Sequence, residues 1–144
     1  MKTLLTLILS IALLIPVTQK PKTITLTVVV DGIKNDNGYI GVALFDGYGD
    51  FPEGEALASK YVEADGSSIE VTFENLESGE YALAIIHDEN GNEEMDYNEY
   101  EMPTEGFGFS NNAMGEMGPP DFSDASFTLA SDNTHTIDLI YMNR

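Results

Sequence analysis

Residues 24–32 read Ile-Thr-Leu-Thr-Val-Val-Val-Asp-Gly and carry apolar side chains at every second position from Ile24 to Val30. This two-residue period, rich in β-branched side chains, is typical of a strand with one buried face. The Asp31-Gly32 pair that follows is a turn signal, so we expect the chain to reverse there.

The same pattern recurs along the chain. Residues 40–45 alternate and end at Asp46-Gly47, and residues 69–74 alternate strictly between apolar and acidic or hydroxyl side chains. Residues 81–86 are almost continuously apolar, as in a central strand that is covered on both faces. Alternation returns at residues 125–129 and 134–142.

These segments predict an all-β fold. About seven strands in about 120 residues favour an immunoglobulin- or transthyretin-like β-sandwich, and a small barrel is the second possibility. Residues 88–123 lose all periodicity, and we expect them to form one long ordered loop. Such a loop in a compact domain is usually functional, so we look for the site there.

Composition excludes several classes of protein. The chain has 144 residues with 6 Lys and Arg against 25 Asp and Glu, a formal net charge of -19, and no Cys. This charge opposes binding to nucleic acid or anionic lipid, because those partners need a basic footprint. Without Cys, the chain has no disulfide, zinc-thiolate site or thiol nucleophile.

The first nineteen residues predict export. Lys2 is followed by the apolar run 4–17, which has the form of a secretory signal peptide and is shorter than the roughly 20 residues of a membrane-spanning helix. The alternatives are a buried N-terminal helix or an uncleaved anchor. We therefore expect a signal peptide at 1–19, a single domain at 20–144 in the periplasm or outside the cell, and no membrane span after cleavage.

The start of the long loop has the spacing of a calcium site. Its oxygen-bearing side chains fall at positions 1, 3, 5, 9 and 12 of an EF-hand-like loop, and a main-chain carbonyl falls at position 7. The predicted Ca²⁺ ligands are Asp88, Asn90, Asn92, Asp96 and Glu99, with the carbonyl of Glu94. Oxygen ligands without thiolates favour calcium over zinc or copper.

Two features depart from an EF-hand. Position 6 needs a sharp turn and is usually Gly, but here it is Glu93, for which a positive φ costs about 1 kcal/mol. A strand precedes the loop where an EF-hand has a helix. The alternative is that Asn90-Gly91 is a simple hairpin turn and that the acids form a solvated rim.

Two other features suggest ligand contact. His87 directly precedes the loop, where it would act as a general base or metal ligand, or anchor the loop as a structural residue. Alternating Gly and Phe residues in the segment 106–109 would either present Phe107 and Phe109 to a sugar or peptide or pack them against the sandwich. Asn111 and Asn112, which tolerate left-handed backbone, complete this possible contact loop.

Residues 87–92 (HDENGN), Asp96, 103–112 (PTEGFGFSNN) and 119–122 (PPDF) together resemble a family of exported bacterial proteins, the domain of unknown function 2141. The resemblance covers residues 24–141 and implies a small secreted or periplasmic β-sandwich without an established activity. Glu93 and Glu101 stand where the family pattern has Gly.

The leading functional prediction is a non-enzymatic, exported β-sandwich module whose acidic loop binds calcium and whose partner is an envelope protein or a glycan. One alternative is a metal-assisted hydrolase that uses His87 beside the same acids. The other is a purely structural envelope protein with no metal site.

Overall fold

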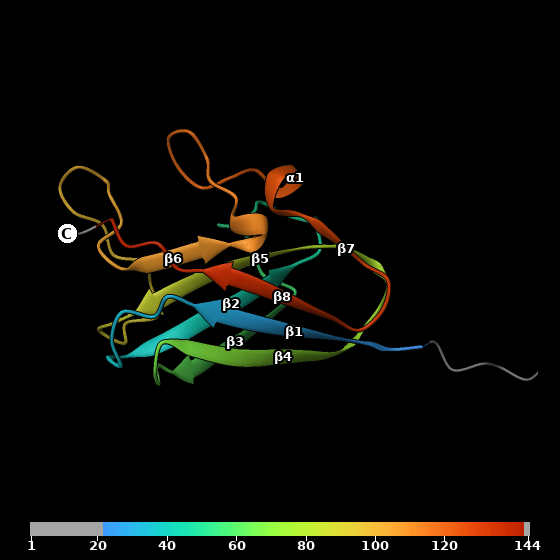
Figure 1. Ribbon diagram of the computed structural model, residues 1–144. Coiled ribbons are helices and arrows are strands. Elements are labelled where there is room, and N and C mark those ends of the chain that lie inside the picture. The colour runs from blue at the N-terminus through green and yellow to red at the C-terminus, as the bar shows by residue number, and fades with distance from the viewer. Residues whose placement is uncertain (1–21, 143–144) are drawn as a thin grey trace, which may run out of the picture.

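The computed structural model describes residues 22–142, so the predicted signal peptide lies outside the described residues. Two β-sheets pack face to face, which confirms the predicted all-β sandwich (Figure 1). No helix within residues 22–142 is long and apolar enough to cross a membrane.

The smaller sheet has three strands in the order β4-β1-β8. The central strand β1 (Ile24–Asp31) pairs antiparallel with β4 (Ser68–Leu76) and parallel with β8 (Asn133–Asp138). The alternation read from residues 24–30 is confirmed, since β1 buries every second side chain from its first residue.

The larger sheet has the strand order β3-β2-β5-β6, with β3 (Ala58–Glu63), β2 (Tyr39–Phe45), β5 (Gly79–Asp88) and β6 (Gly106–Phe109). A short strand, β7 (Phe127–Leu129), pairs with the start of β5. The central strand β5 contains the almost continuously apolar segment and has a strand partner at each edge. Leu83 and Ile85 belong to the main core and Ala82 to a second cluster on the other face, so residues on both faces are buried, as the sequence predicts.

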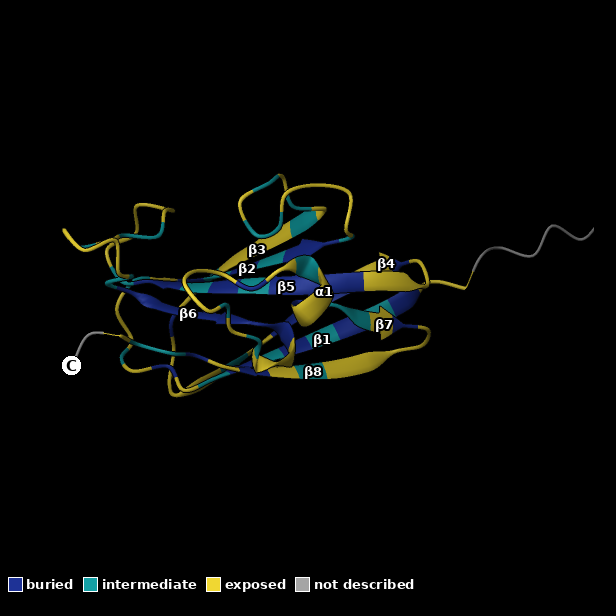
Figure 2. Cartoon of the chain, turned by 90° about the horizontal axis from the view of Figure 1, so that it is seen from above, coloured by how far each residue is buried: buried dark blue, intermediate teal, exposed yellow. Residues whose placement is uncertain are grey.

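The main core lies between the two sheets (Figure 2). It consists of the inward residues of every long strand, among which Leu26, Ile40, Leu44, Leu83, Ile85 and Ile137 are almost completely buried. At about 25 cal/mol per Å² of apolar surface, each of these side chains contributes roughly 1.5–3 kcal/mol to folding. This interface therefore holds the two sheets together.

A second, smaller cluster covers part of the outer face of the larger sheet. Here Phe107 and Phe109 of β6 pack with Ala82 and with Ala125 of the short helix α1 (Phe122–Ala125). Phe51, from the loop between β2 and β3, places its ring centroid 5.1 to 6.0 Å from those of Phe45, Phe109 and Phe122. We call this group the outer cluster.

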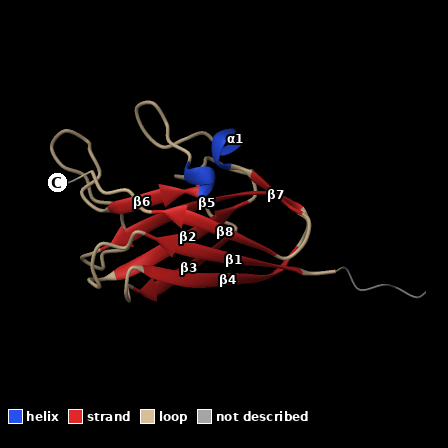
Figure 3. Cartoon of the chain, in the orientation of Figure 1, coloured by secondary structure: helices blue, strands red, loops and turns tan. Residues whose placement is uncertain are grey.

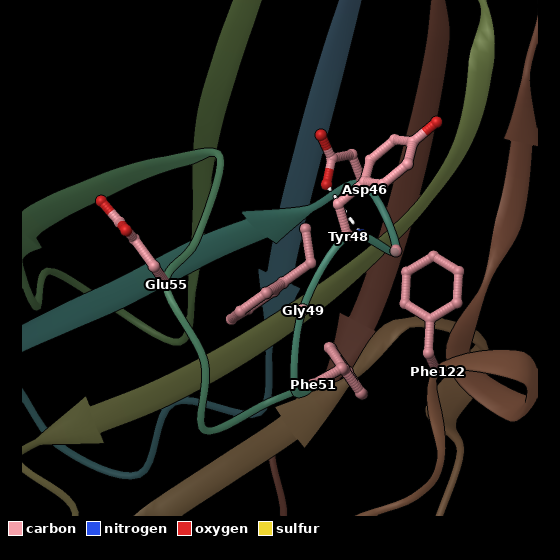
Figure 4. Close-up of a pocket in the computed structure, with 8 residues that line it drawn as sticks. Asp46, Tyr48, Gly49, Phe51, Glu55 and Phe122 are labelled. Atoms are coloured by element: carbon pink, nitrogen blue, oxygen red, sulfur yellow. Dashed lines mark hydrogen bonds between the residues drawn. The ribbon is translucent and has the colours of Figure 1, made fainter.

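A small hollow remains between the β2–β3 loop and α1 (Figure 4). Its volume is about 10 Å³, which is room for about one water molecule. Gly47 permits this close approach, because a Cβ there would lie 3.1 Å from the ring of Phe122. The hollow is a packing defect at the edge of the outer cluster and is too small for a ligand.

The stretch 88–123 is not a loop throughout. It contains β6 and the 3-10 turn η1 (Ser110–Asn112), so two long loops, 89–105 and 113–121, remain (Figure 3). The sequence pattern also missed β3. As an edge strand, β3 exposes most of its side chains and so lacks an apolar period.

Candidate functional site

Asp88 ends β5 and lies at the centre of the loop that follows. Its side chain is fully buried, and its carboxylate accepts hydrogen bonds from three successive main-chain N–H groups. Oδ1 lies 2.7 Å from the nitrogen of Gly91 and 3.2 Å from that of Asn92, and Oδ2 lies 2.7 Å from that of Glu93. The hydroxyl of Tyr61, on β3, donates to the same Oδ2. Asp88 therefore folds the chain back on itself and ties the loop to the edge of the sheet.

These hydrogen bonds also shift the pKa values of Asp88 and Tyr61. Burial alone would raise the pKa of Asp88, but the hydrogen bonds from Tyr61 and from the three N–H groups outweigh it and hold the pKa below its usual value. Burial and the hydrogen bond to Asp88 both raise the pKa of Tyr61. At neutral pH Asp88 is therefore an ionised carboxylate, and it accepts a hydrogen bond from the protonated hydroxyl of Tyr61.

Three of the other predicted ligands gather beside Asp88. The amide nitrogen of Asn92 lies 3.1 and 3.2 Å from the two carboxylate oxygens of Asp96, and the amide of Asn90 donates to Asp96 Oδ2. The amide oxygen of Asn90 accepts a hydrogen bond from the N–H of Asn92, and the amide oxygen of Asn92 accepts one from the N–H of Glu94, each at 3.0 Å. The side chains at loop positions 3, 5 and 9 thus lie together, and the carboxylate at position 1 contacts this group through the main-chain N–H of Asn92.

Glu99 does not join them. It is exposed in the turn that follows, and its carboxylate makes no hydrogen bond within residues 22–142. The carbonyl of Glu94 likewise accepts no hydrogen bond there. The carbonyl at position 7 and the carboxylate at position 12 therefore make no hydrogen bond to the four residues above.

The turn at position 6 forms without Gly. Glu93 adopts φ = 64° and Glu101 adopts φ = 59°, the left-handed conformation that favours Gly. Each costs about 1 kcal/mol, and the hydrogen bond from Glu93 N–H to Asp88 offsets this cost at the first position. A left-handed turn therefore forms at position 6 without Gly.

Glu105 is a site residue that the loop spacing did not reveal. It is buried, and its two carboxylate oxygens accept the main-chain N–H groups of Glu89, at 3.0 Å, and Asp96, at 3.3 Å. Burial raises its pKa, the two N–H groups partly offset this, and the nearby carboxylates of Asp96 and Asp88 raise it further. Glu105 thus binds the two ends of the loop segment 89–96 through their main-chain N–H groups. It lies close to them because β6, which follows Glu105, pairs with β5.

His87 is fully buried beneath the loop, and both of its ring nitrogens are occupied. Nε2 lies 2.8 Å from the carbonyl oxygen of Asn37, which only accepts, so Nε2 carries the proton and donates. In the neutral imidazole, Nδ1, 2.6 Å from the hydroxyl of Tyr141, then accepts from it. The same hydroxyl accepts the N–H of Lys34 at 3.1 Å. The geometry gives His87 an anchoring role and leaves it no free nitrogen for a substrate or metal.

The Gly-Phe segment packs against the protein body. Phe107 and Phe109 are buried in the outer cluster and present no ring face to solvent. The side chain of Asn111 donates to the carbonyls of Asp124 and Ser126 at 3.2 and 2.8 Å, and that of Asn112 exchanges hydrogen bonds with Asp138. These residues join η1 to α1 and β8.

The sequence profile of one protein family matches residues 28–137, from β1 to β8. It is described as DUF2141, an uncharacterized protein conserved in bacteria. The chain belongs to this family. A comparison with curated proteins and another with solved structures gave no match.

Membership of DUF2141 confirms the resemblance read from the loop motifs, and the matched range includes both loops and the Gly-Phe segment. The family description assigns no activity, so the chemistry of the site depends on its own residues. Within residues 22–142, no three His, Cys, Asp or Glu side chains are grouped so that they could hold a metal ion. A cation at this DUF2141 loop would therefore depend on the amide oxygens of Asn90 and Asn92 in addition to the carboxylates of Asp88 and Asp96, a donor set that suits Ca²⁺.

Proposed function

We propose that this protein is an exported, non-enzymatic β-sandwich module whose 88–99 loop binds Ca²⁺ and presents an ordered surface to an envelope partner. The observation that carries the proposal is the cluster that Asn90, Asn92 and Asp96 form through their side chains, beside a backbone turn that Asp88 holds in place. Export is supported by Lys2 and the apolar run 4–17, which together have the form of a secretory signal peptide.

The charge of the loop supports a cation. Eight of the eighteen residues from Asp88 to Glu105 are acidic. The hydrogen bonds to the carboxylates of Asp88, Asp96 and Glu105 come from main-chain N–H groups, amides and one hydroxyl, and none comes from a lysine within residues 22–142. A bound Ca²⁺ would relieve the mutual repulsion of these groups.

Thermal unfolding of the purified protein tests the site. Extracellular Ca²⁺ sites have dissociation constants near 10⁻⁴–10⁻³ M. With 10 mM Ca²⁺, mass action then stabilises the folded state by about 1.4–2.7 kcal/mol over EDTA, a rise in Tm of about 5–10 °C. Mg²⁺ is expected to give a much smaller rise, because it demands a tighter octahedral shell.

Asp96→Asn is the sharpest variant, because Asp96 is a proposed ligand whose loss breaks only solvent-exposed hydrogen bonds. It should abolish the response to Ca²⁺ while leaving the Tm in EDTA within about 3 °C of the native protein. Glu116→Gln, which removes an acid from the exposed loop 113–121, is the matched control and should keep the full response. Superimposable curves of the native protein in EDTA and Ca²⁺ would reject the calcium site and leave a purely structural module.

Export is tested separately. Expression of the full chain in a bacterium with a periplasm should yield a soluble periplasmic product that lacks residues 1–19 or close to them, as determined by N-terminal sequencing. A product that retains Met1 and stays in the membrane fraction would support the uncleaved anchor.

A further inference from the structure

A groove of about 410 Å³ lies on the outer face of the larger sheet, over β2, β3 and β5. Its volume is within the range of small-molecule sites. The groove begins where the outer cluster ends, between Pro52 of the β2–β3 loop and Glu93 of the 89–105 loop. Its lining consists of Gly41, Val42, Ala43, Pro52, Ser59, Lys60, Tyr61, Ala84, Ile86 and Glu93.

The floor of the groove is flat and apolar. Gly41 and Ala43 of β2 lie directly opposite Ile86 and Ala84 of β5, so small side chains lie side by side on the face that points away from the main core. A Cβ at Gly41 would lie only 3.0 Å from the side chain of Ile86, so a larger residue there would crowd Ile86 and fill part of the groove. An aliphatic chain can therefore lie against the sheet.

Tyr61 bounds one side of the groove, and Tyr39 packs against it. The rings of Tyr61 and Tyr39 stack with centroids 4.8 Å apart and an angle of 18° between their planes. Both are partly exposed, at 38% and 36%. The hydroxyl of Tyr61 is held by Asp88, so this ring has a fixed position at the groove wall. The π-face of such a ring attracts a cation.

The charge at this end is negative. Glu93 is exposed, and its carboxylate has no hydrogen-bond or ion-pair partner within residues 22–142. Lys60 lies opposite Val42 in the register, and Val42 belongs to the main core, so the lysine side chain starts from the other face of the sheet. In a chain of net charge -19, an anionic ligand would be repelled from this groove.

We propose that this groove binds a small organic cation, an ammonium group on an aliphatic body. The body lies over Gly41, Ala43 and Ala84. The ammonium lies between the carboxylate of Glu93 and the ring of Tyr61, where an ion pair and a cation–π contact act together. This site is separate from the proposed Ca²⁺ ligands, since Glu93 supplies only its main chain to the turn around Asp88.

Three probes with one body and different charges test the proposal by NMR titration of the ¹⁵N-labelled protein in EDTA. They are hexylammonium, hexanol and hexanoate. With about seven non-hydrogen atoms each, their affinities are expected in the millimolar range at best. Hexylammonium should shift the amide signals of Gly41, Ala43 and Ala84, hexanol should bind several-fold more weakly, and hexanoate should give no saturable shift.

Two variants locate the interaction. Ala43→Leu fills the groove from its floor and should abolish the shifts, whereas Thr136→Leu, the same kind of change on exposed β8, should keep them. Glu93→Gln should weaken hexylammonium about threefold, the scale of an exposed ion pair, and bring it close to hexanol. Glu70→Gln removes an exposed charge from β4 and should change nothing.

Several results would overturn the proposal. These are no saturable shift with hexylammonium, binding that Ala43→Leu leaves unchanged, or equal binding of all three probes, which would indicate a non-selective apolar surface. Shifts confined to residues 88–99 would place the amine in the acidic loop instead of the groove and would also reject it.

Discussion

Asp88 is the residue on which the loop most depends, and replacing it by Asn gives the clearest test of the structure. The change keeps the size of the side chain but leaves one accepting oxygen in place of two. In one orientation of the Asn side chain the hydrogen bonds from Gly91 and Asn92 are lost; in the other the bond from Glu93 is lost and the Tyr61 hydroxyl accepts from the NH₂ group. A hydrogen bond to a charged group contributes about 1.5–3 kcal/mol and one between neutral groups about 0.5–1.5 kcal/mol, so the loss of at least one bond and the weakening of the others predict a destabilisation of about 3–5 kcal/mol in EDTA.

Urea unfolding followed by circular dichroism measures this loss. With a slope of about 2 kcal/mol per M, the midpoint of Asp88→Asn should fall by about 2 M. Asp46→Asn is the matched control, because Asp46 makes a single exposed turn hydrogen bond, to Tyr48 N–H, that Asn can replace. Its midpoint should move by less than about 0.3 M. Tyr61→Phe removes one of the four bonds to Asp88 and should fall between the two.

The pH dependence of this penalty has a definite sign. The hydrogen bonds to Asp88 hold its folded-state pKa below the ordinary value of an aspartate, so its stabilisation is fully present well above that ordinary value and is lost as the pH falls through the lower folded value. The difference between the native protein and Asp88→Asn should be constant from pH 7 to about 4.5 and then shrink in more acidic solution. A midpoint for Asp88→Asn within about 0.3 M of the native protein at pH 7 would refute the role assigned to this carboxylate.

Three further changes test other parts of the structure. Ser110→Ala leaves two buried main-chain groups without their hydroxyl partner and should cost about 2–4 kcal/mol in urea unfolding, whereas Ser126→Ala, at a partly exposed hydroxyl, should cost under about 0.5 kcal/mol. Because the pKa of Glu105 is raised in the folded state, the native protein should gain stability relative to Glu105→Gln as the pH falls from 7 toward 4.5; no change across this range would contradict the burial of that carboxyl. Tyr141→Phe leaves a buried histidine nitrogen without its donor and should cost about 1–2 kcal/mol; a Tm unchanged within 1 °C would show that the pairing is dispensable.

The strands that bury one face could be predicted from the sequence because their periodicity reflects the main core directly. Two strands could not. In β3, only Ala58 and Val62 pack against the main core. Lys60 lies between them in the strand and is exposed at the sheet edge, where a charge discourages pairing with another chain. The pattern of an edge strand is therefore mostly polar.

The strand β6 could not be predicted from the sequence, for the opposite reason. All four of its residues are buried, so it shows no polar face. Its phenylalanines point to the outer cluster, and its glycines face β8 and the C-terminal segment, where a Cβ at Gly106 would meet the ring of Tyr141 at 2.4 Å and one at Gly108 would meet Ile137 at 2.9 Å. A glycine strand of this kind is visible only once its neighbours are known.

The spacing of the acidic loop predicted which side chains lie together but not what holds them. Asp88, Asn90, Asn92 and Asp96 are close in sequence, so a local turn suffices to gather them. Tyr61 and Glu105 come from other elements, and no local pattern connects them to the loop. Long-range contacts of this kind depend on strand pairing, which the sequence specifies only through the whole fold.

The order already present in the loop limits what a bound ion can add. The N–H groups of residues 91–93 are held by Asp88 before any cation arrives, so binding does not have to fix the backbone. What binding must change is the contact of the two amide NH₂ groups with Asp96, because these groups lie where a cation between the same side chains would lie. The ion thus replaces exposed hydrogen bonds with stronger contacts to oxygen, and Asn90 and Asn92 must turn their oxygens toward it, away from the N–H groups of Asn92 and Glu94. The side-chain amide signals of Asn90 and Asn92 should therefore respond to Ca²⁺ more strongly than the backbone signals of Gly91 and Glu93, and the reverse order would mean that the turn around Asp88 forms only with the ion.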